Sequence, residues 1–453
     1  MSTISAIENN LSSNSYSRSN SACKRWDYFK NLASIVCSRE STYRTALDIT
    51  AFDIPVMFAD AFRGPKKFIE TSFETLTGAL TIFLAPQITS FVGNVFGKFL
   101  LPKNMQKNTS HYLRFSMQEL RDFKSFSSAA SRIKNEECED KNFVASLYTR
   151  SGNLNKANQY KEELKGIEEF CNSFIPSAEV QNYIYKLKKA TIVGESFIEG
   201  IWWGGTGLII RAFRKYILRE GRFTGTLSYA TDNESEALGE AGDLNIFQKI
   251  VGLIAIPLGS IINAILLIKA EDEKLLEKNN FLKTVRTQFD MTHAFYPKIG
   301  LLFSMIIIPK YVGVLTTSQG WYERFERLLK LVTIVPSWWL GHRVTNGLFA
   351  LNADNVLSKK YKVQPGILVE REYLYPKNKN KFFRWLNQTF PEPAKIHHVL
   401  KETSENKKLQ DEAEDLHARC LYKGFTLHSI LVWIISMGVN YTTKLRVQNA
   451  LGK

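Results

Sequence analysis

The sequence predicts an all-α fold: a polytopic helical membrane protein with proline-kinked helices and helical polar extensions. Three stretches carry no Asp, Glu, Lys or Arg, namely 75–97, 250–268 and 424–443. A helix that spans a bilayer needs about 20 apolar residues, and each stretch is close to that length. Prolines recur in the apolar runs, and the alternating pattern of half-buried strands is scarce.

Composition supports a mixed, partly membrane-embedded chain. The 453 residues are 44% apolar and 23% charged, with a formal net charge of +15. Basic residues recur beside apolar runs, as in 211–222 and 377–385, and this placement favours anionic lipid headgroups. We therefore expect the lipid bilayer as the partner, with no nucleic acid.

The N-terminal part divides into a tail, a first membrane segment and an insertion. Residues 1–22 are rich in Ser and Asn and are expected to be disordered. Residues 23–103 combine a basic amphipathic segment with the first membrane segment, and 63–73 could lie at the headgroups, with a solvated helix as the alternative. Residues 104–190 alternate charged helical patterns with polar breaks, which predicts a polar helical insertion.

Residues 191–353 are expected to form the membrane core. Its segments are about 250–268, 299–320 and 331–353, and 191–218 is expected to be interfacial or re-entrant because its apolar run is too short to span. Within the third segment, Arg343 interrupts the apolar run.

The C-terminal part is expected to consist of a polar region followed by an apolar membrane segment. Residues 354–423 form a basic polar region with amphipathic helices, in which 366–375 is the one strand-like stretch. Residues 424–453 hold the last membrane segment and a short tail. Five scattered cysteines without a CxxC pair favour a reduced, cytoplasmic compartment for the polar regions.

Four prolines lie within or near the middle of apolar runs: Pro86, Pro257, Pro309 and Pro336. A proline inside a helix removes one backbone hydrogen bond and costs about 3 kcal/mol in water. In a membrane bundle, neighbouring groups can satisfy the freed carbonyl, so kinked helices are expected. The alternative is that the prolines end short helices in hairpins that enter only part of the bilayer.

Three polar residues in the apolar segments are candidates for an intramembrane site: Lys310, Asn263 and Arg343. A lysine at bilayer depth is costly and by default indicates function. The alternative for Lys310 is a shifted helix, from which the side chain reaches the interface.

Aromatic and basic residues are candidates for contact with lipid headgroups: Trp202, Trp203, Arg211, Trp338, Trp339, Phe382, Arg384 and Trp385. Tryptophan is enriched at the headgroup level, where the ring meets lipid and the N–H meets water. A Trp pair beside an arginine could hold a lipid phosphate, and simple anchoring is the alternative.

Other motifs are weak. Gly204, Gly205 and Gly207 could form an anion-binding loop or allow close helix packing. Glu195 and Glu199 could act as a carboxylate dyad, but we expect them to complement the positive start of a helix.

No metal and no cofactor are expected. Metal-ligand chemistry at helical spacing is confined to six residues: His397, His398, Glu402, Glu414, His417 and Cys420. A complete site needs three or four converging ligands, and this region has the pattern of a solvated helix face.

The function expected from these features is non-enzymatic. One class is transport or channel-like, in which Lys310, Asn263 and the kinks line a polar pathway. The other is a membrane-organising or interaction protein that uses its basic amphipathic helices. Two alternatives stay open: a large soluble all-α protein that binds lipid or a membrane surface, and a lipid-modifying membrane enzyme.

Overall fold

The computed structural model describes residues 21–38, 43, 46–238, 245–273, 275, 278, 308–375 and 381–453. Every regular element in these ranges is a helix, which confirms the all-α prediction. The strand expected at 366–375 is wrong: α17 (Arg371–Leu374) is helical, and one isolated bridge joins Val369 to Pro393. The preceding backbone N–H groups bond to a side chain, Asp354, instead of to a partner strand.

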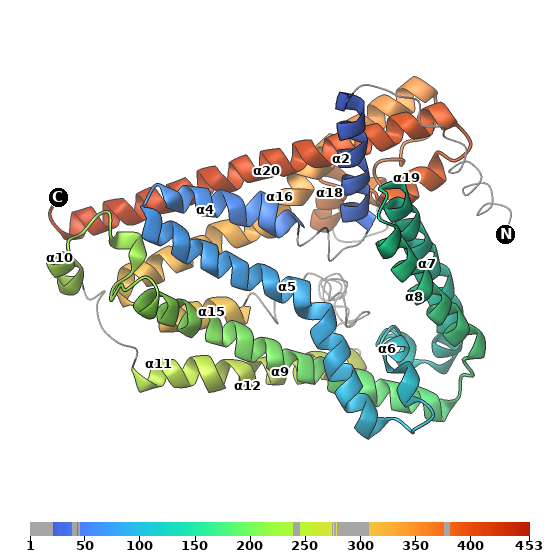
Figure 1. Cartoon of the computed structure of the whole chain (residues 1–453), viewed down its shortest axis with the longest axis horizontal. Helices are drawn as coiled ribbons and strands as arrows, with labels where there is room; N and C mark the ends of the chain where they lie inside the picture. Colours follow the sequence, from blue (N-terminus) through green and yellow to red (C-terminus); the bar gives the residue numbers. More distant parts are fainter. Residues whose placement is uncertain are drawn as a thin grey trace.

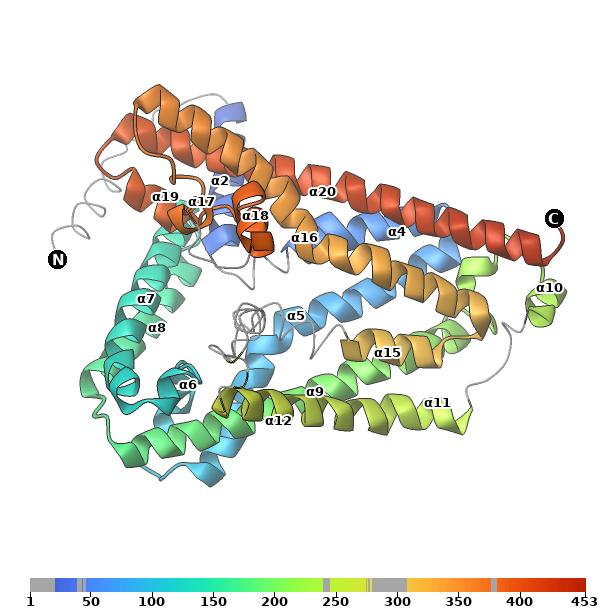
Figure 2. The ribbon, with the colours of Figure 1, turned by 180° about the vertical axis from the view of Figure 1, so that it is seen from behind.

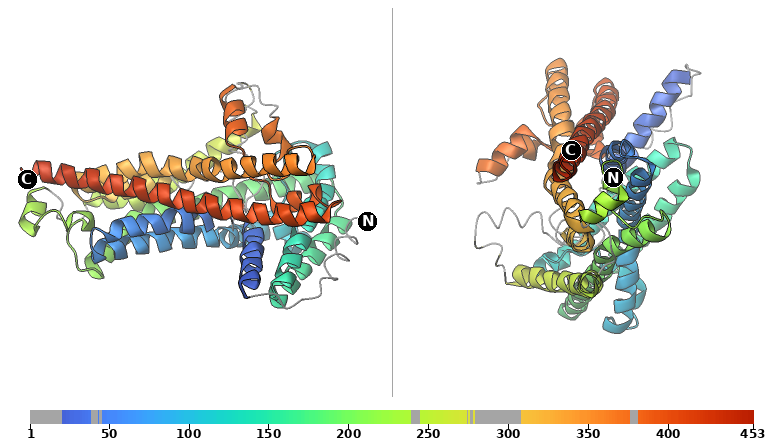
Figure 3. Two further views of the ribbon diagram at one scale, coloured as in Figure 1. Left: turned by 90° about the horizontal axis from the view of Figure 1, so that it is seen from above. Right: turned by 90° about the vertical axis from the view of Figure 1, so that its left-hand side faces the viewer.

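Long helices run along the longest axis of the molecule (Figures 1 and 2). Four of them have 36 to 44 residues: α5 (Pro65–Leu100), α9 (Ala178–Tyr216), α16 (Gly320–Tyr361) and α20 (Lys407–Ala450). Three shorter helices complete this bundle: α4 (Ile54–Ala61), α12 (Ile256–Asp272) and α15 (Ile308–Thr317). The view from above shows α16 and α20 side by side over much of their length (Figure 3).

Helix α9 packs against α5, α12 and α15. Its start is capped by Ser177, whose side chain accepts the Val180 N–H at 3.2 Å, and its last turn carries Arg214 and Lys215, which suit the helix dipole. Small residues allow the close crossings. A Cβ on Gly204 would lie 2.7 Å from the Gly252 carbonyl oxygen of the segment before α12.

Three of the four prolines lie in helices that continue through them, whereas the residues that precede α15 and Pro309 lie outside the described ranges. Pro86 and Pro336 are interior to α5 and α16, and α5 changes direction along its course (Figure 1). Two π-helical segments, η1 (Leu47–Asp53) and η5 (Val251–Ala255), end just before Ile-Pro pairs. The wider turn of a π-helix tolerates the hydrogen bond that is lost because proline has no backbone N–H. Kinked continuous helices therefore describe these sites better than partial hairpins.

A second unit packs on the distal parts of α5 and α9. It contains α6 (Thr109–Tyr112), α7 (Phe123–Arg150) and α8 (Leu154–Ser173), and its core is aromatic, with Phe115, Phe126 and Phe170 buried. Asp122 caps α7 by accepting the Ser125 N–H at 2.9 Å.

The remaining helices are short or lie at the ends of the bundle. Helices α2 (Ser21–Ser38) and α19 (Ile396–Glu402) contact α20, and α18 (Lys381–Thr389) lies beside α17. Helices α10 (Asp232–Ala237) and α11 (Ile246–Ile250) lie at the end that holds the C-terminus (Figure 1). The tail 1–20 lies outside the described residues.

Two helical stretches among the described residues are long and apolar enough to cross a membrane: Ile246–Ala270 and Lys407–Ala450. They contain the expected segments 250–268 and 424–443. The segments 75–97 and 331–353 lie in α5 and α16, which do not meet this length and composition test, and residues 299–307 lie outside the described ranges. Two such helices are weak evidence for membrane association, because a core helix of a soluble protein can pass the same test.

Candidate functional site

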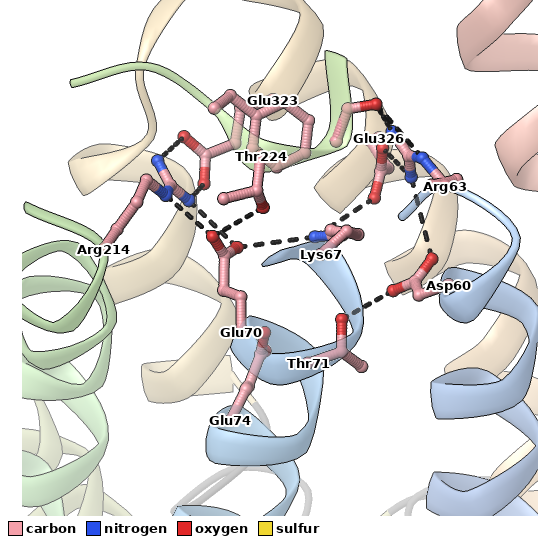
Figure 4. A network of polar contacts seen from close by, with 12 residues as sticks. Asp60, Arg63, Lys67, Glu70, Thr71, Glu74, Arg214, Thr224, Glu323 and Glu326 are labelled. Atoms are coloured by element: carbon pink, nitrogen blue, oxygen red, sulfur yellow. Dashed lines mark hydrogen bonds and ion pairs between the residues drawn. The ribbon is translucent and has the colours of Figure 1, made fainter. Parts of the chain in front are cut away.

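Ten charged side chains meet at one end of the bundle, where α4 and α9 end and α5 and α16 begin, and Figure 4 labels all of them except Arg327 and Lys330. We call them the ion-pair cluster: Asp60, Glu70, Glu74, Glu323 and Glu326 with Arg63, Lys67, Arg214, Arg327 and Lys330. Nine are buried and Glu74 is half-buried. Five acids balance five bases, which is what burial of so many charges requires.

Local sequence explains how the cluster forms. Lys67, Glu70 and Glu74 follow helical spacing and share one face of α5. Two of the three long helices that supply the cluster start at a glycine with positive φ: Gly64, at +110°, directly precedes α5, and Gly320, at +67°, is the first residue of α16. Such a backbone conformation favours glycine, and it lets the chain turn sharply from α4 into α5 and from α15 into α16.

Arg214 is the centre of one half of the cluster. Its Nε and Nη2 donate to the Glu70 carboxylate at 2.8 and 3.1 Å, and its Nη2 and Nη1 donate to Glu323 at 2.7 and 3.2 Å. Nη1 also donates to Gln319 at 2.6 Å. These contacts use all five guanidinium N–H groups, so Arg214 has no donor left for a ligand.

Arg63 is the centre of the other half. Its Nη1 lies 2.7 Å from the Glu326 carboxylate and donates to Asn440 of α20 at 2.9 Å, and its Nε donates to the Gly225 carbonyl oxygen at 3.1 Å. Lys330 lies 3.0 Å from Glu326 and 3.2 Å from Asp60. The cluster and its contacts thus join five helices, α4, α5, α9, α16 and α20, and the loop at Gly225.

The bases of the cluster lower the pKa of two of its buried carboxyl groups, Glu70 and Glu326. Burial alone would raise the pKa of Glu70, but Arg214 and Lys67 outweigh it and hold that pKa well below its usual range. Glu326 behaves alike, because burial is outweighed by Arg63 and Lys330, and its pKa lies far below normal. Burial opposes the charge of Arg214, yet Glu323 and Glu70 raise its pKa. Chemically, the cluster is a charge-balanced clamp between helix ends, in which Arg214 is saturated while both Glu326 oxygens have no hydrogen-bond partner in the described structure.

A second polar site lies further along α9. Glu195 and Glu199 are one helical turn apart and 5% and 4% exposed. Thr89 of α5 donates to Glu195 at 2.5 Å. Both acids lie in the middle of α9, which begins at Ala178, so the expectation that they complement a helix start is wrong. Glu179 occupies the first turn instead.

Lys310 lies inside the bundle near this second site. Its Nζ is 5.4 Å from the centroid of the Trp203 ring, a distance suited to a cation–π contact. It lies 3.7 Å from the position that a Cβ on Gly78 of α5 would take. The side chain is half-buried. The lysine of α15 therefore points between α5 and α9.

The other intramembrane candidates lie apart from Lys310. Asn263 of α12 is half-buried, and its Nδ2 has no hydrogen-bond partner within the described part of the chain. Arg343 of α16 donates to Asn387 at 3.0 Å and lies 3.5 Å from Glu392. The structure thus brings Arg343 to the α18 region and does not join it with Lys310 or Asn263.

The headgroup candidates separate into buried and exposed groups. Trp203 is 2% exposed and faces the bundle, whereas Trp202 is 38% exposed. Arg211 is half-buried and donates to the Thr317 carbonyl oxygen at 3.5 Å. Arg384 and Trp385 of α18 are exposed. The side chains of Trp338, Trp339 and Phe382 lie outside the described part of the structure.

The glycine and histidine motifs have structural roles. Gly204, Gly205 and Gly207 lie within α9, and a Cβ on Gly207 would lie 2.8 Å from the Gly313 carbonyl oxygen of α15, so close packing explains that glycine. The rings of His398 and His417 each contact a backbone carbonyl oxygen at 2.9 Å. No group of three or more metal-ligating side chains occurs among the described residues.

Sequence reasoning missed the ion-pair cluster. Residues 63–73 were expected to face lipid headgroups or solvent, but Arg63 and Lys67 are 3% and 1% exposed, because acids on α5 and α16 neutralise them. The available signal was local: acids and bases recur at spacings of three and four residues in both 67–74 and 323–330.

Comparison of the chain with protein-family models, curated proteins and solved structures finds no match.

Proposed function

We propose that the chain is a multi-pass integral membrane protein of the transport or channel-like class, in which a polar path along α9 conducts protons. The observation that carries the proposal is an inverted distribution of polarity. Charged and polar side chains gather inside the bundle, and large apolar side chains cover its outside. Water-soluble proteins rarely expose large contiguous apolar patches, and they almost never bury unpaired acids.

The apolar outside is continuous along single helices. On α11, η5 and α12 the exposed large apolar residues are Ile246, Phe247, Ile250, Leu253, Ile254, Leu258, Ile262, Ile265 and Leu266. From Ile246 to Leu266 a helix rises about 30 Å, which equals the thickness of the hydrocarbon core. In the most apolar window of this stretch only 28% of the residues are buried, whereas a soluble core helix would be mostly buried.

Other helices repeat this pattern. On α20 the exposed apolar residues include Leu427, Ile430, Leu431, Trp433 and Ile434, and on α5 they include Leu76, Leu80, Leu84 and Phe91. On α16, Leu328, Val332 and Leu348 are exposed. Exposed apolar side chains on these four helical stretches support several crossings, including those by 75–97 and 331–353.

The interior supplies polar groups in line. Glu195, Glu199 and Trp203 follow each other at four-residue spacing and lie on one stripe of α9. Lys310 lies over the Trp203 ring, and its positive charge helps Arg327 to lower the pKa of Glu74. Glu74 pairs with Arg327 at 2.6 Å and belongs to the ion-pair cluster. The stripe thus connects the middle of α9 with the cluster.

The ion-pair cluster fits the boundary of the hydrocarbon core. Its residues precede 75–97 on α5, precede 331–353 on α16, and close α9 at Arg214. Charges at this depth can be hydrated or paired at lower cost than at the bilayer centre. We assign the cluster the role of holding the helix ends while protons pass along α9.

The test has two parts. Carbonate extraction of membranes that contain the full chain should leave it in the pellet, and release into the supernatant would favour the soluble alternative. In proteoliposomes with an internal pH-sensitive dye, the wild-type protein should dissipate a pH gradient. Lys310→Met should abolish this flux, and Lys66→Met, at a more exposed lysine, should not. Equal flux in the Lys310→Met variant would contradict the pathway.

A second candidate function is membrane organisation, favoured by α18. Arg384 and Trp385 are both exposed on this short basic helix, which suits an anionic lipid surface. Vesicles rich in phosphatidylserine would be deformed by the wild-type protein under this alternative. If the protein deforms vesicles through Arg384 and Trp385 and conducts no protons, membrane organisation becomes the better description of its function than transport.

A further inference from the structure

We propose that Glu195 and Glu199 form a proton-binding site within the bundle, in which the two carboxyl groups hold one exchangeable proton. This inference rests on the proposed membrane location of α9, and it names the group that carries the proton in the proposed path.

The two acids differ from the buried acids of the ion-pair cluster. Glu70 of the ion-pair cluster has Arg214, Lys67 and Thr224 around its carboxylate. Glu195 has the Thr89 hydroxyl, and Glu199 has no hydrogen-bond or ion-pair partner among the residues that the structure describes. A buried carboxylate without a cation costs several kcal/mol, so such a group must be neutralised.

Two further polar groups near these acids lack partners. Trp203 follows Glu199 by one turn of α9, is 2% exposed, and its Nε1 has no acceptor in the described structure. Ser260 of α12 is 4% exposed, and its hydroxyl, also without a described partner, lies 2.9 Å from the position of a Cβ on Gly200. One unused donor on α9 and one on the facing turn of α12 therefore lie at the turns of α9 that carry the unpaired acid, and this second observation indicates a site for a polar ligand.

The chemistry of the site selects the smallest cation. Side chains four residues apart on a helix are neighbours, with about 6 Å between their Cβ atoms, so two negative charges there repel each other. One proton removes that repulsion because it neutralises one carboxylate by forming an O–H bond. This O–H group can then donate a hydrogen bond to an oxygen of the second carboxylate. A metal cation needs more ligands: Ca²⁺ takes 6–8 oxygens. No group of three or more potential metal-ligating side chains is present in the described ranges.

The experiment measures proton binding directly. Infrared spectra of the detergent-solubilised full chain should contain the C=O absorption of a protonated carboxyl group, and Glu199→Gln should remove it. The matched control is Glu179→Gln, an exposed acid in the first turn of the same helix, which should leave the absorption unchanged. Thr89→Val, which removes the donor to Glu195, should shift the absorption without removing it.

The outcomes separate this site from the transport proposal. Loss of the absorption in Glu199→Gln, with no proton flux in wild-type proteoliposomes, supports the site and contradicts transport. If the wild-type protein conducts protons but neither Glu195→Gln nor Glu199→Gln changes the C=O absorption, the proposed proton-binding site is contradicted. An absorption that disappears when Na⁺ is added to the wild-type protein also overturns the proposal, because the acids then bind a metal cation.

Discussion

The Arg214 guanidinium joins the Glu70 carboxylate through two parallel hydrogen bonds of 2.8 and 3.1 Å, although the residues are 144 positions apart. This pair ties the end of α9 to the start of α5. Because both side chains are buried, water cannot solvate either charge after its partner is removed. The cost of breaking the pair should therefore be far larger than for a surface ion pair.

Arg214→Met should lower the free energy of unfolding by about 3–5 kcal/mol, because it leaves Glu70 and Glu323 without their main counter-charge. Thermal unfolding in detergent, followed by tryptophan fluorescence, measures this. The control is Lys215→Met at the next, exposed residue, which should change stability by less than about 0.5 kcal/mol. Equal midpoints for the two variants would contradict the clamp.

Two glycines of α9 should respond in opposite directions to alanine. Gly207→Ala should destabilise by about 1–3 kcal/mol, since its Cβ would meet the Gly313 carbonyl oxygen at 2.8 Å. Gly205→Ala should stabilise by about 0.5–1 kcal/mol, because nothing lies within 4 Å of its Cβ and alanine favours the helix. Denaturation curves of both variants give the signs, and the same sign for both would show that the α9–α15 crossing is not this close.

Asp354 should control the loop that follows α16. Its carboxylate accepts the backbone N–H groups of Gly366, Ile367 and Leu368 at 2.8, 2.8 and 2.6 Å. Asp354→Ala should leave these buried donors unpaired and cost about 3 kcal/mol or more. Hydrogen exchange with mass spectrometry should show faster exchange in 366–369 while α9 is unaffected. Unchanged exchange in that segment would mean that the loop is held by other contacts.

His111 should make the α6–α8 unit sensitive to acid. Burial, with Arg114 and Lys141 nearby, lowers the pKa of His111 to about 4, and its ring stacks on Phe170 at 4.9 Å. The unfolded histidine, with a pKa near 6.5, therefore binds more protons between about pH 4 and 6.5, so stability rises with pH in this window. The thermal midpoint should fall as pH drops from about 6.5 to 4, and His111→Phe should flatten the slope. Parallel slopes for the two proteins would contradict this assignment.

The all-α class could be predicted because it depends on local patterns. Long uncharged runs, helical spacing and the lack of alternation are all visible in one sequence, and Pro86 and Pro336 do lie inside continuous helices. The expected strand at 366–375 failed because Asp354, 12 to 14 residues earlier, takes the hydrogen bonds that a strand would need.

Which helices pair in the ion-pair cluster could not be predicted, for a different reason. Arg327 and Glu74 are 253 residues apart, and no local pattern shows which faces of α5 and α16 meet. A lysine beside an apolar run looks the same whether it reaches the headgroups, as expected for 63–73, or pairs inside a bundle, as Lys67 does. Trp202 and Trp203 could not be distinguished either, since only the position of α12 and α15 decides which ring is covered.

The balance of five acids and five bases in the ion-pair cluster has an electrical consequence. A membrane potential acts on net charge, at about 2.3 kcal/mol per elementary charge for 100 mV. In a uniform field, a group of charges that sums to zero experiences no net force, so moving the ion-pair cluster as one body across the field would cost no such energy. Any response to voltage would then arise where charge is unbalanced, at Lys310 and at the acids on α9.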